Sequence, residues 1–174
     1  MTIIDTKAIA DQLLAKLFTR FPALFRRWVR KHRFVEFADT PWTPFSGKIN
    51  HSRVALLTTA GVHLKRDPAF NMRDPAGDPS FREIPTRSTP ADLTITHNYY
   101  DHRDADTDIN VVFPLERLVE LDAADEIGSV NWRHFSFMGH ILPPHLHSLI
   151  TVTAPQVAGL LKRDGVDIAI LTPA

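Results

Sequence analysis

The stretch RVALLTTAGVH, residues 53–63, decides the expected fold of this 174-residue chain. It is a short apolar run that ends in small polar residues and a glycine, which is typical of a strand buried in a parallel sheet. Strands of this kind place small polar groups at the carboxyl edge of the sheet, where α/β proteins bind ligands. We therefore predict that Thr59 and Gly61 contribute to a substrate-binding site at that edge.

The sequence after this run alternates between strand-like and helix-like patterns. This alternation predicts an α/β fold with a mostly parallel sheet and flanking helices. The last strand has the composition of a central buried strand, and Thr172 at its end is a third expected substrate-binding residue. Residues 65–90 contain five prolines and are predicted to be a long irregular stretch. The expected elements are strand 92–97, a helix from Pro114 to 121, strand 130–137, a helix over 155–163 that ends near Gly165, and strand 166–172.

Two helices are expected before the first strand. Apolar residues recur at helical spacing over 4–19, where Asp5 or Thr6 can cap the helix, and Pro22 can open a second helix from its first turn. A proline-rich connector over 38–51 follows. We therefore divide the chain into an N-terminal helical segment, residues 1–40, and an α/β domain, residues 50–174, which we expect to be the front part of a longer natural domain.

The second helix carries a cluster of basic residues on one side. Such a cluster is either a solvated helix face or a docking surface for an acidic partner. Lys and Arg together number 20, as do Asp and Glu, so no overall field favours nucleic acid or an anionic membrane. We predict that residues 26–33 serve an interface, and that neither nucleic acid nor membrane is a partner. The cluster consists of Arg20, Arg26, Arg27, Arg30, Lys31 and Arg33.

The residue content limits the chemistry of the chain. No apolar run approaches a membrane span, the N-terminus lacks the pattern of a secretory signal, and the cytoplasm is the expected location. The chain contains no cysteine, which excludes disulfides, zinc ribbons and thiol catalysis within it. His140, His145 and His147 lie close together, but Pro143 and Pro144 interrupt the spacing and no carboxylate stands beside them. We expect no metal site and no cofactor.

A dense polar and aromatic loop follows the strand 92–97. It offers acids, bases and hydrogen-bond donors within a few residues, where α/β folds collect ligand groups, although Asn, Asp and Tyr also serve ordinary surface turns. We predict that His97, Tyr100 and Asp101 are catalytic. We also predict that they lie at the carboxyl edge of the sheet, close to the end of strand 166–172.

Four stretches in order resemble one protein family. They are VALLTTAGV at 54–62, the His–Tyr–Asp segment at 97–101, NVVFPLERL at 110–118 with EIG at 126–128, and VAGLLKRDGVDIAILT at 157–172. Together they resemble the selenoprotein B subunit of the glycine, sarcosine, betaine and D-proline reductases. The resemblance covers roughly residues 53–174. Residues 4–33 and the histidine loop 140–147 depart from the family pattern, and the family's longer members are well over twice this size.

The resemblance implies a function. In that family a selenocysteine follows the apolar strand within a few residues, and a cysteine usually comes soon after. The expectation is therefore that the natural protein continues past Ala174 with selenocysteine, and that the 174-residue chain is inactive as given. The resemblance also implies a reductase that cleaves a C–N or related bond in a small amino-acid-like substrate, with reductase partner subunits.

Two other functions remain open from the residues. One is a non-catalytic small-molecule-binding or interaction module of the same fold. The other is an acid–base or metal-dependent enzyme that uses His97, Asp101 and the histidines of 140–147. We also expect a homo-oligomer in which a neighbour covers the region 166–174, because apolar surface at an incomplete sheet edge is commonly covered by self-association.

Overall fold

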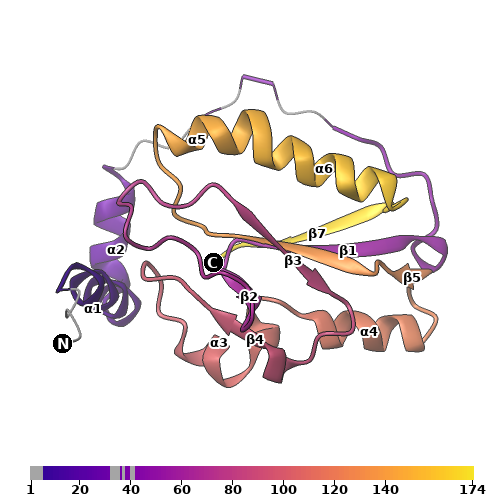
Figure 1. Cartoon of the computed structure of the whole chain (residues 1–174), viewed down its shortest axis with the longest axis horizontal. Helices are drawn as coiled ribbons and strands as arrows, with labels where there is room; N and C mark the ends of the chain where they lie inside the picture. Colours follow the sequence, from indigo (N-terminus) through magenta and orange to yellow (C-terminus); the bar gives the residue numbers. More distant parts are fainter. Residues whose placement is uncertain (1–5, 32–35, 37, 40–41) are drawn as a thin grey trace.

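The computed structural model describes residues 6–31, 36, 38–39 and 42–174. Helices flank a five-stranded, mostly parallel sheet, which confirms the expected α/β class. Helices α5 and α6 lie over one face of the sheet, α3 and α4 lie over the other, and α1 and α2 lie at one end of the molecule (Figure 1). The helices are α1 (Thr6–Arg20), α2 (Pro22–Val29), α3 (Arg103–Thr107), α4 (Leu115–Ala123), α5 (His145–Ser148) and α6 (Ala154–Arg163).

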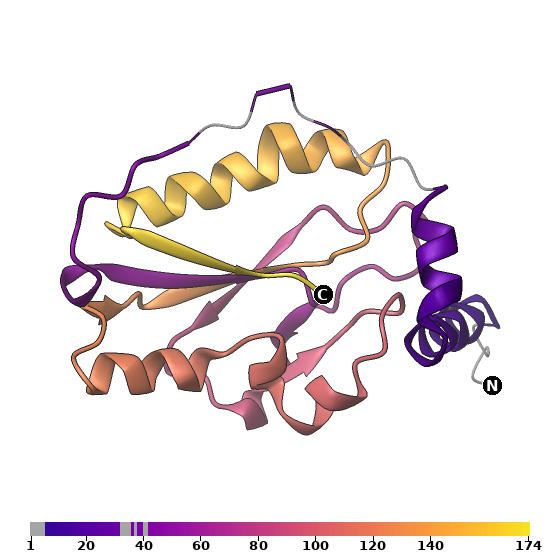
Figure 2. The ribbon, with the colours of Figure 1, turned by 180° about the vertical axis from the view of Figure 1, so that it is seen from behind.

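The sheet is built around β1. Strand β7 pairs with β1 along one side, and β5 and β6 pair with it along the other, all parallel to it. Strand β3 pairs antiparallel with the outer side of β6. Figure 2 shows the same layers from behind, with β7 running beside β1. The strands are β1 (Arg53–Thr58), β3 (Phe81–Pro85), β5 (Ser129–Val130), β6 (Arg133–Phe137) and β7 (Ile168–Thr172).

The stretch 53–63 is not one strand. Strand β1 ends at Thr58, and β2 (Val62–Leu64) belongs to a separate two-stranded sheet with β4 (Leu93–Ile95), to which it is antiparallel. Gly61 between the two strands has φ 70°, a left-handed conformation that redirects the chain. The interpretation of 92–97 as a strand of the parallel sheet was therefore wrong.

Two further expectations about strands need correction. Residues 65–90 are not wholly irregular, because β3 lies within them on the outer edge of β6, a position that tolerates Pro85. Strand β7 is not buried, since it pairs with β1 alone and its Leu171 side chain is 70% exposed. An apolar composition cannot distinguish a central strand from an edge strand. That a neighbouring molecule covers this region remains a prediction.

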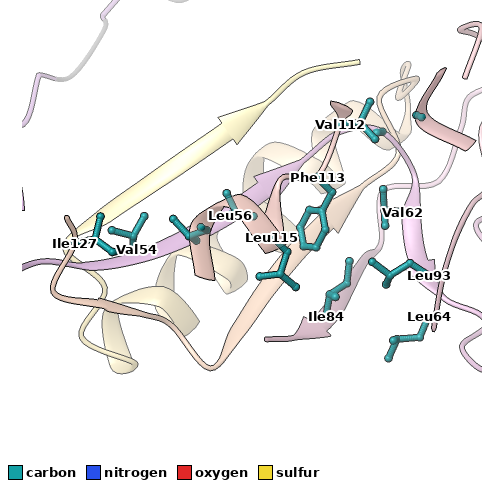
Figure 3. Packing of buried hydrophobic residues seen from close by; sticks show 13 residues of the cluster. Val54, Leu56, Val62, Leu64, Ile84, Leu93, Val112, Phe113, Leu115 and Ile127 are labelled. Atoms are coloured by element: carbon teal, nitrogen blue, oxygen red, sulfur yellow. The ribbon is translucent and has the colours of Figure 1, made fainter. Parts of the chain in front are cut away.

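Two apolar clusters hold the layers together. The larger one packs between β1 and the elements on the α4 side, with Phe113 and Leu56 almost wholly buried at its centre (Figure 3). The smaller one lies on the α6 side and joins Phe135 and Phe137 of β6 to Val157 of α6. Both faces of the central strands are thus buried, which agrees with the continuous apolar run of β1.

The helix boundaries follow local signals in the sequence. Pro22 occupies the first turn of α2, and α4 begins directly after Pro114, as expected. Helix α6 ends in a Schellman motif, in which Gly165 has φ 69° and Val166 N–H donates to Leu161 O at 3.0 Å. The predicted helix start at residue 4, the cap Asp5 and the basic residue Arg33 lie outside the described residues. Across the described ranges, no helix combines the length and apolarity needed to cross a membrane.

A buried ion pair joins α6 to the sheet at the end opposite the carboxyl edge. Asp164 accepts hydrogen bonds from Arg133 Nε at 2.7 Å and Nη2 at 2.9 Å, and from Asn131 Nδ2 at 3.2 Å. These bonds, led by that from Arg133, lower the pKa of Asp164. The Arg133 and Asp164 side chains are 12% and 7% exposed, and Arg133 also contacts Glu83 at 3.0 Å.

We expect Asp164→Asn to lower the free energy of unfolding by about 2 kcal/mol, because it leaves the largely buried Arg133 guanidinium with Glu83 as its one carboxylate partner. Urea denaturation at pH 7 measures the loss. The matched control is Glu120→Gln, which breaks an Arg117–Glu120 pair whose two side chains are 59% and 58% exposed. That change should cost less than about 0.5 kcal/mol. Equal losses in the two variants would contradict the assignment of a stabilising role to Asp164.

Candidate functional site

A pocket of about 410 Å³ opens at the carboxyl edge of the sheet. Its walls come from three places: the loop after β4, the turn after β6 together with the end of β7, and the helices α1 and α2. The placement of 97–101 beside the end of strand 166–172 therefore agrees with the prediction. The lining residues are His97, Tyr99, Tyr100, Asp101, Gly139, His140, Ala174, Ala15, Phe18, Thr19 and Phe25.

A backbone contact at Gly61, which the sequence did not indicate, holds the loop that carries His97 at this edge. Gly61 N–H donates to Phe137 O at 3.0 Å, and Gly61 O accepts from Thr96 N–H at 2.9 Å. Gly61 thus joins the end of β6 to the segment after β4, although β4 belongs to the small sheet. A Cβ on Gly61 would lie 2.4 Å from Thr96 O, so the contact requires glycine. This contact positions His97 beside the carboxyl ends of the parallel strands.

His97 is a buried, neutral hydrogen-bond donor. His97 is only 4% exposed. Burial is the main cause that lowers the pKa of its imidazole to about 4, and repulsion from His140 and His102 adds to it. Tyr99 N–H donates to Nδ1 at 3.0 Å, so the ring proton sits on Nε2. Within the described part of the chain Nε2 has no hydrogen-bond partner. It lies 3.3 Å from the point where a Cβ on Gly139 would stand, in the wall of the pocket. A buried donor without a protein partner can donate to a ligand or to a water molecule in the pocket.

Tyr100 and Asp101 have fixed charge states beside His97. The Tyr100 hydroxyl donates to Ala60 O at 3.1 Å, and the Tyr100 ring meets the His97 ring edge-on at 4.8 Å. Burial raises the pKa of Tyr100, so the phenol is neutral. The Asp101 carboxylate accepts from Arg103 Nε at 2.9 Å and Nη2 at 2.6 Å. The hydrogen bond from Arg103 lowers the pKa of Asp101, which is ionised near pH 7.

The three residues predicted to bind substrate lie behind the lining of the pocket. Thr59 Oγ1 accepts from Ala174 N–H at 3.1 Å, and Thr59 N–H donates to Thr172 O at 3.1 Å. The Thr172 hydroxyl donates to Val112 O at 2.7 Å and is therefore turned into the protein. Gly61 supports the segment that carries His97. The described geometry gives all three a role in holding the pocket wall, and direct contact with a substrate remains a prediction.

Sequence reasoning named His140 only as a member of the histidine loop, and it gave no pocket role to Phe18, Phe25 or Gly139. His140 stacks on Tyr99 with ring centroids 3.8 Å apart, and its Nε2 lies 3.0 Å from Pro75 O. Phe18 and Phe25 come from the N-terminal helices, where their spacing indicates only ordinary packing. Gly139 follows β6 and admits both His97 and Ala174, since its Cβ would lie 3.2 Å from Ala174 O. For Gly139, the available signal was a glycine two residues after the end of a strand.

The histidine loop 140–147 does not gather its imidazoles. His140 contacts Pro75, and His145 Nε2 forms an ion-pair contact with Asp74 at 2.8 Å. Among the residues that the structure describes, no group of three or more His, Cys, Asp or Glu side chains is arranged to hold a metal ion. The polar groups in the pocket lining are instead an imidazole N–H donor on His97 and a carboxylate acceptor on Asp101, which suit a small polar ligand.

The fold and the pocket define an α/β protein that gathers ligand groups at the carboxyl edge of a mostly parallel sheet. Over 131 residues the chain is 37% identical to the D-proline reductase subunit gamma of Acetoanaerobium sticklandii, a match that covers 75% of this chain and 52% of that subunit. The chain is therefore a homologue of this D-proline reductase subunit over the matched region. It spans about half the length of the curated relative that it matches. No family model matches the chain, and no solved structure matches it.

Proposed function

We propose that this protein is a subunit of a selenocysteine-dependent reductase that acts on a small amino-acid-like substrate, and that the pocket at the carboxyl edge is its reaction site. One observation carries the proposal. The buried Nε2–H of His97 has no partner in the described structure, and it lies beside Gly139, close to the end of β7. The family resemblance implies a selenocysteine shortly after this strand. The homology to a D-proline reductase subunit supports the substrate class.

The pocket residues take complementary roles in this proposal. His97 is not a general base near pH 7, because its pKa is about 4 and its proton is on Nε2. It donates a hydrogen bond to an anion, either the selenolate or the substrate carboxylate. Asp101 is an ionised carboxylate in the pocket lining and can receive a substrate ammonium group. Tyr100 positions the His97 ring through its edge-on contact.

The reaction is a two-electron reduction. The substrate C–N bond breaks, and carbon and nitrogen each gain one hydrogen, which requires two electrons and two protons. The selenolate and a neighbouring thiol supply the electrons and become a selenenyl sulfide, which a partner subunit then reduces. The described residues bind and orient the substrate, and His97 donates a hydrogen bond to the chalcogen. An anionic chalcogen is the reactive form, so a nearby buried N–H donor favours the reaction.

A cysteine appended after Ala174 tests the site. We expect its thiol pKa to lie about one unit below the ordinary value of about 8.5, because His97 Nε2–H stabilises the thiolate in a partly enclosed pocket. The His97→Ala variant should return the pKa to the ordinary range. The measurement is the pH dependence of thiolate absorbance and of alkylation rate.

Ser46→Cys, at an exposed position, is the matched control and should titrate as an ordinary thiol. If the appended cysteine titrates like this control and ignores the His97→Ala change, the redox proposal fails. Titration with D-proline, followed through the imidazole nitrogen signals of His97, tests the substrate class separately. If D-proline shifts those signals while the appended cysteine keeps an ordinary thiol pKa, the result would favour the alternative function, a non-catalytic binding module.

A further inference from the structure

The N-terminal helices present an apolar and basic surface to solvent. Large apolar residues are exposed on this surface: Leu13 is 61% exposed, Phe21 50% and Leu24 46%. Residues 16–31 contain six Lys or Arg residues and no Asp or Glu. We call this surface the arm face. Its basic residues are Lys16, Arg20, Arg26, Arg27, Arg30 and Lys31, all exposed.

The opposite side of the two helices is attached to the body of the protein. Ala15 is buried, and Gln12 Nε2 donates to Asn98 Oδ1 at 3.2 Å. Phe18 and Phe25 line the pocket beside the loop that carries His97. One side of α1 thus contacts the body of the protein, while the residues of the arm face are exposed to solvent. A surface with this many exposed large apolar residues is characteristic of a protein interaction site.

A second surface of the same chain has the opposite charge. Residues 101–126 contain nine Asp or Glu residues and two Arg residues, a formal charge of −7 on a chain whose total is 0. Apolar side chains are exposed among these acids, with Val111 62%, Leu121 43% and Val119 41% exposed. We call this surface the α4 face. Its exposed acidic residues are Asp104, Asp106, Asp108, Glu116, Glu120, Asp125 and Glu126.

We propose that the arm face of one copy binds the α4 face of a second copy. The two surfaces are opposite in charge, and each presents exposed apolar side chains among its charges. Both views of the molecule place α4 away from α1 and α2, so the arm face of one chain does not lie against its own α4 (Figures 1 and 2). Reciprocal binding of two copies forms two such contacts and closes as a dimer. The inference is independent of the proposed function.

Charge reversal with rescue tests the pairing. Sedimentation of the full chain at low ionic strength should show a dimer, and raising the salt concentration should dissociate it because exposed charges are screened. The arm variant Arg26→Glu/Arg27→Glu should weaken the dimer at least about tenfold. The α4 variant Glu120→Lys/Glu126→Lys should do the same. In an equimolar mixture of the two variants, both contacts of a mixed dimer pair opposite charges, one as in the wild type and one with the signs exchanged, so the mixed dimer should form more tightly than the dimer of either variant alone.

The control variant Lys162→Glu/Arg163→Glu reverses two exposed charges on α6 and should leave the dimer intact. Circular dichroism of each variant shows whether it is folded, so a loss of assembly is not mistaken for unfolding. A wild-type chain that is monomeric at low salt, a dimer that ignores both reversals, or a mixture without recovery would each overturn the proposal. A monomer that binds vesicles of anionic lipid through the arm face would also overturn it and assign that face to a membrane surface.

Discussion

Lowering the pH from 7 to 4 is expected to reduce the free energy of unfolding by about 3 kcal/mol for each of two buried imidazoles, His97 and His134. His134 is fully buried, and its Nδ1 accepts from Leu56 N–H at 2.9 Å. Its Nε2 lies 3.1 Å from Thr86 Oγ1. Burial lowers the pKa of His134 to about 4, as it does for His97. Both imidazoles are therefore neutral in the folded protein at pH 7.

The direction follows from proton binding. Unfolded histidine has a pKa of 6.5, so between pH 6.5 and about 4 the unfolded chain binds protons that the folded chain does not. Stability is complete above pH 6.5 and falls as the pH approaches 4. Carboxylates with a lowered pKa, such as Asp164, contribute stability that is lost below their ordinary pKa of 3.8, outside this window.

Urea denaturation at several pH values between 7 and 4 measures this slope. His134→Asn keeps an acceptor near the position of Nδ1 but cannot be protonated, so about 3 kcal/mol of the pH dependence should disappear. His97→Asn should have a similar effect. Leu118→Ala, a change at a buried core position, should lower stability at every pH and keep the slope. A wild-type stability that is constant from pH 7 to 4 would show that these imidazoles are not buried in the neutral form.

The second large effect is expected for Gly61→Ala, which should cost about 3 kcal/mol or more. Gly61 has φ 70°, and the added Cβ would meet the Thr96 carbonyl oxygen at 2.4 Å. That carbonyl belongs to the backbone next to His97, so relief of the clash must shift the imidazole away from Gly139. We therefore expect both lower stability and changed His97 imidazole signals, measured by urea denaturation and by NMR.

Gly159→Ala is the matched control for this prediction. Gly159 lies within α6, and the nearest atom to an added Cβ is the flexible Arg163 Nη1 at 3.5 Å. Alanine is the better helix former, so this change should stabilise the protein by about 0.5–1 kcal/mol. If Gly61→Ala proves as mild as Gly159→Ala and leaves the His97 signals unchanged, Gly61 does not position the site.

Several features of the protein could be determined from the sequence because they depend on local interactions. The alternation of apolar strands with amphipathic helices identified the α/β class. Pro22, Pro114 and Gly165 marked helix ends correctly, because proline suits a first turn and glycine readily adopts the left-handed conformation after the last one. The polar loop from His97 to Asp101 was also found from its composition. These signals act over a few residues and are visible in one stretch of chain.

The tertiary structure decided which segments are neighbours. Strand β7 has the composition of a central strand but lies at an edge, and 92–97 resembles a strand of the main sheet but pairs with β2. Phe18 and Phe25 resemble ordinary helix residues, yet they line a pocket with His97. Strand pairing and helix docking join residues far apart in the chain, and no local pattern encodes the partner. The neutral state of His97 and its free donor therefore emerge only when the folded chain buries the ring and places Tyr99 N–H against Nδ1.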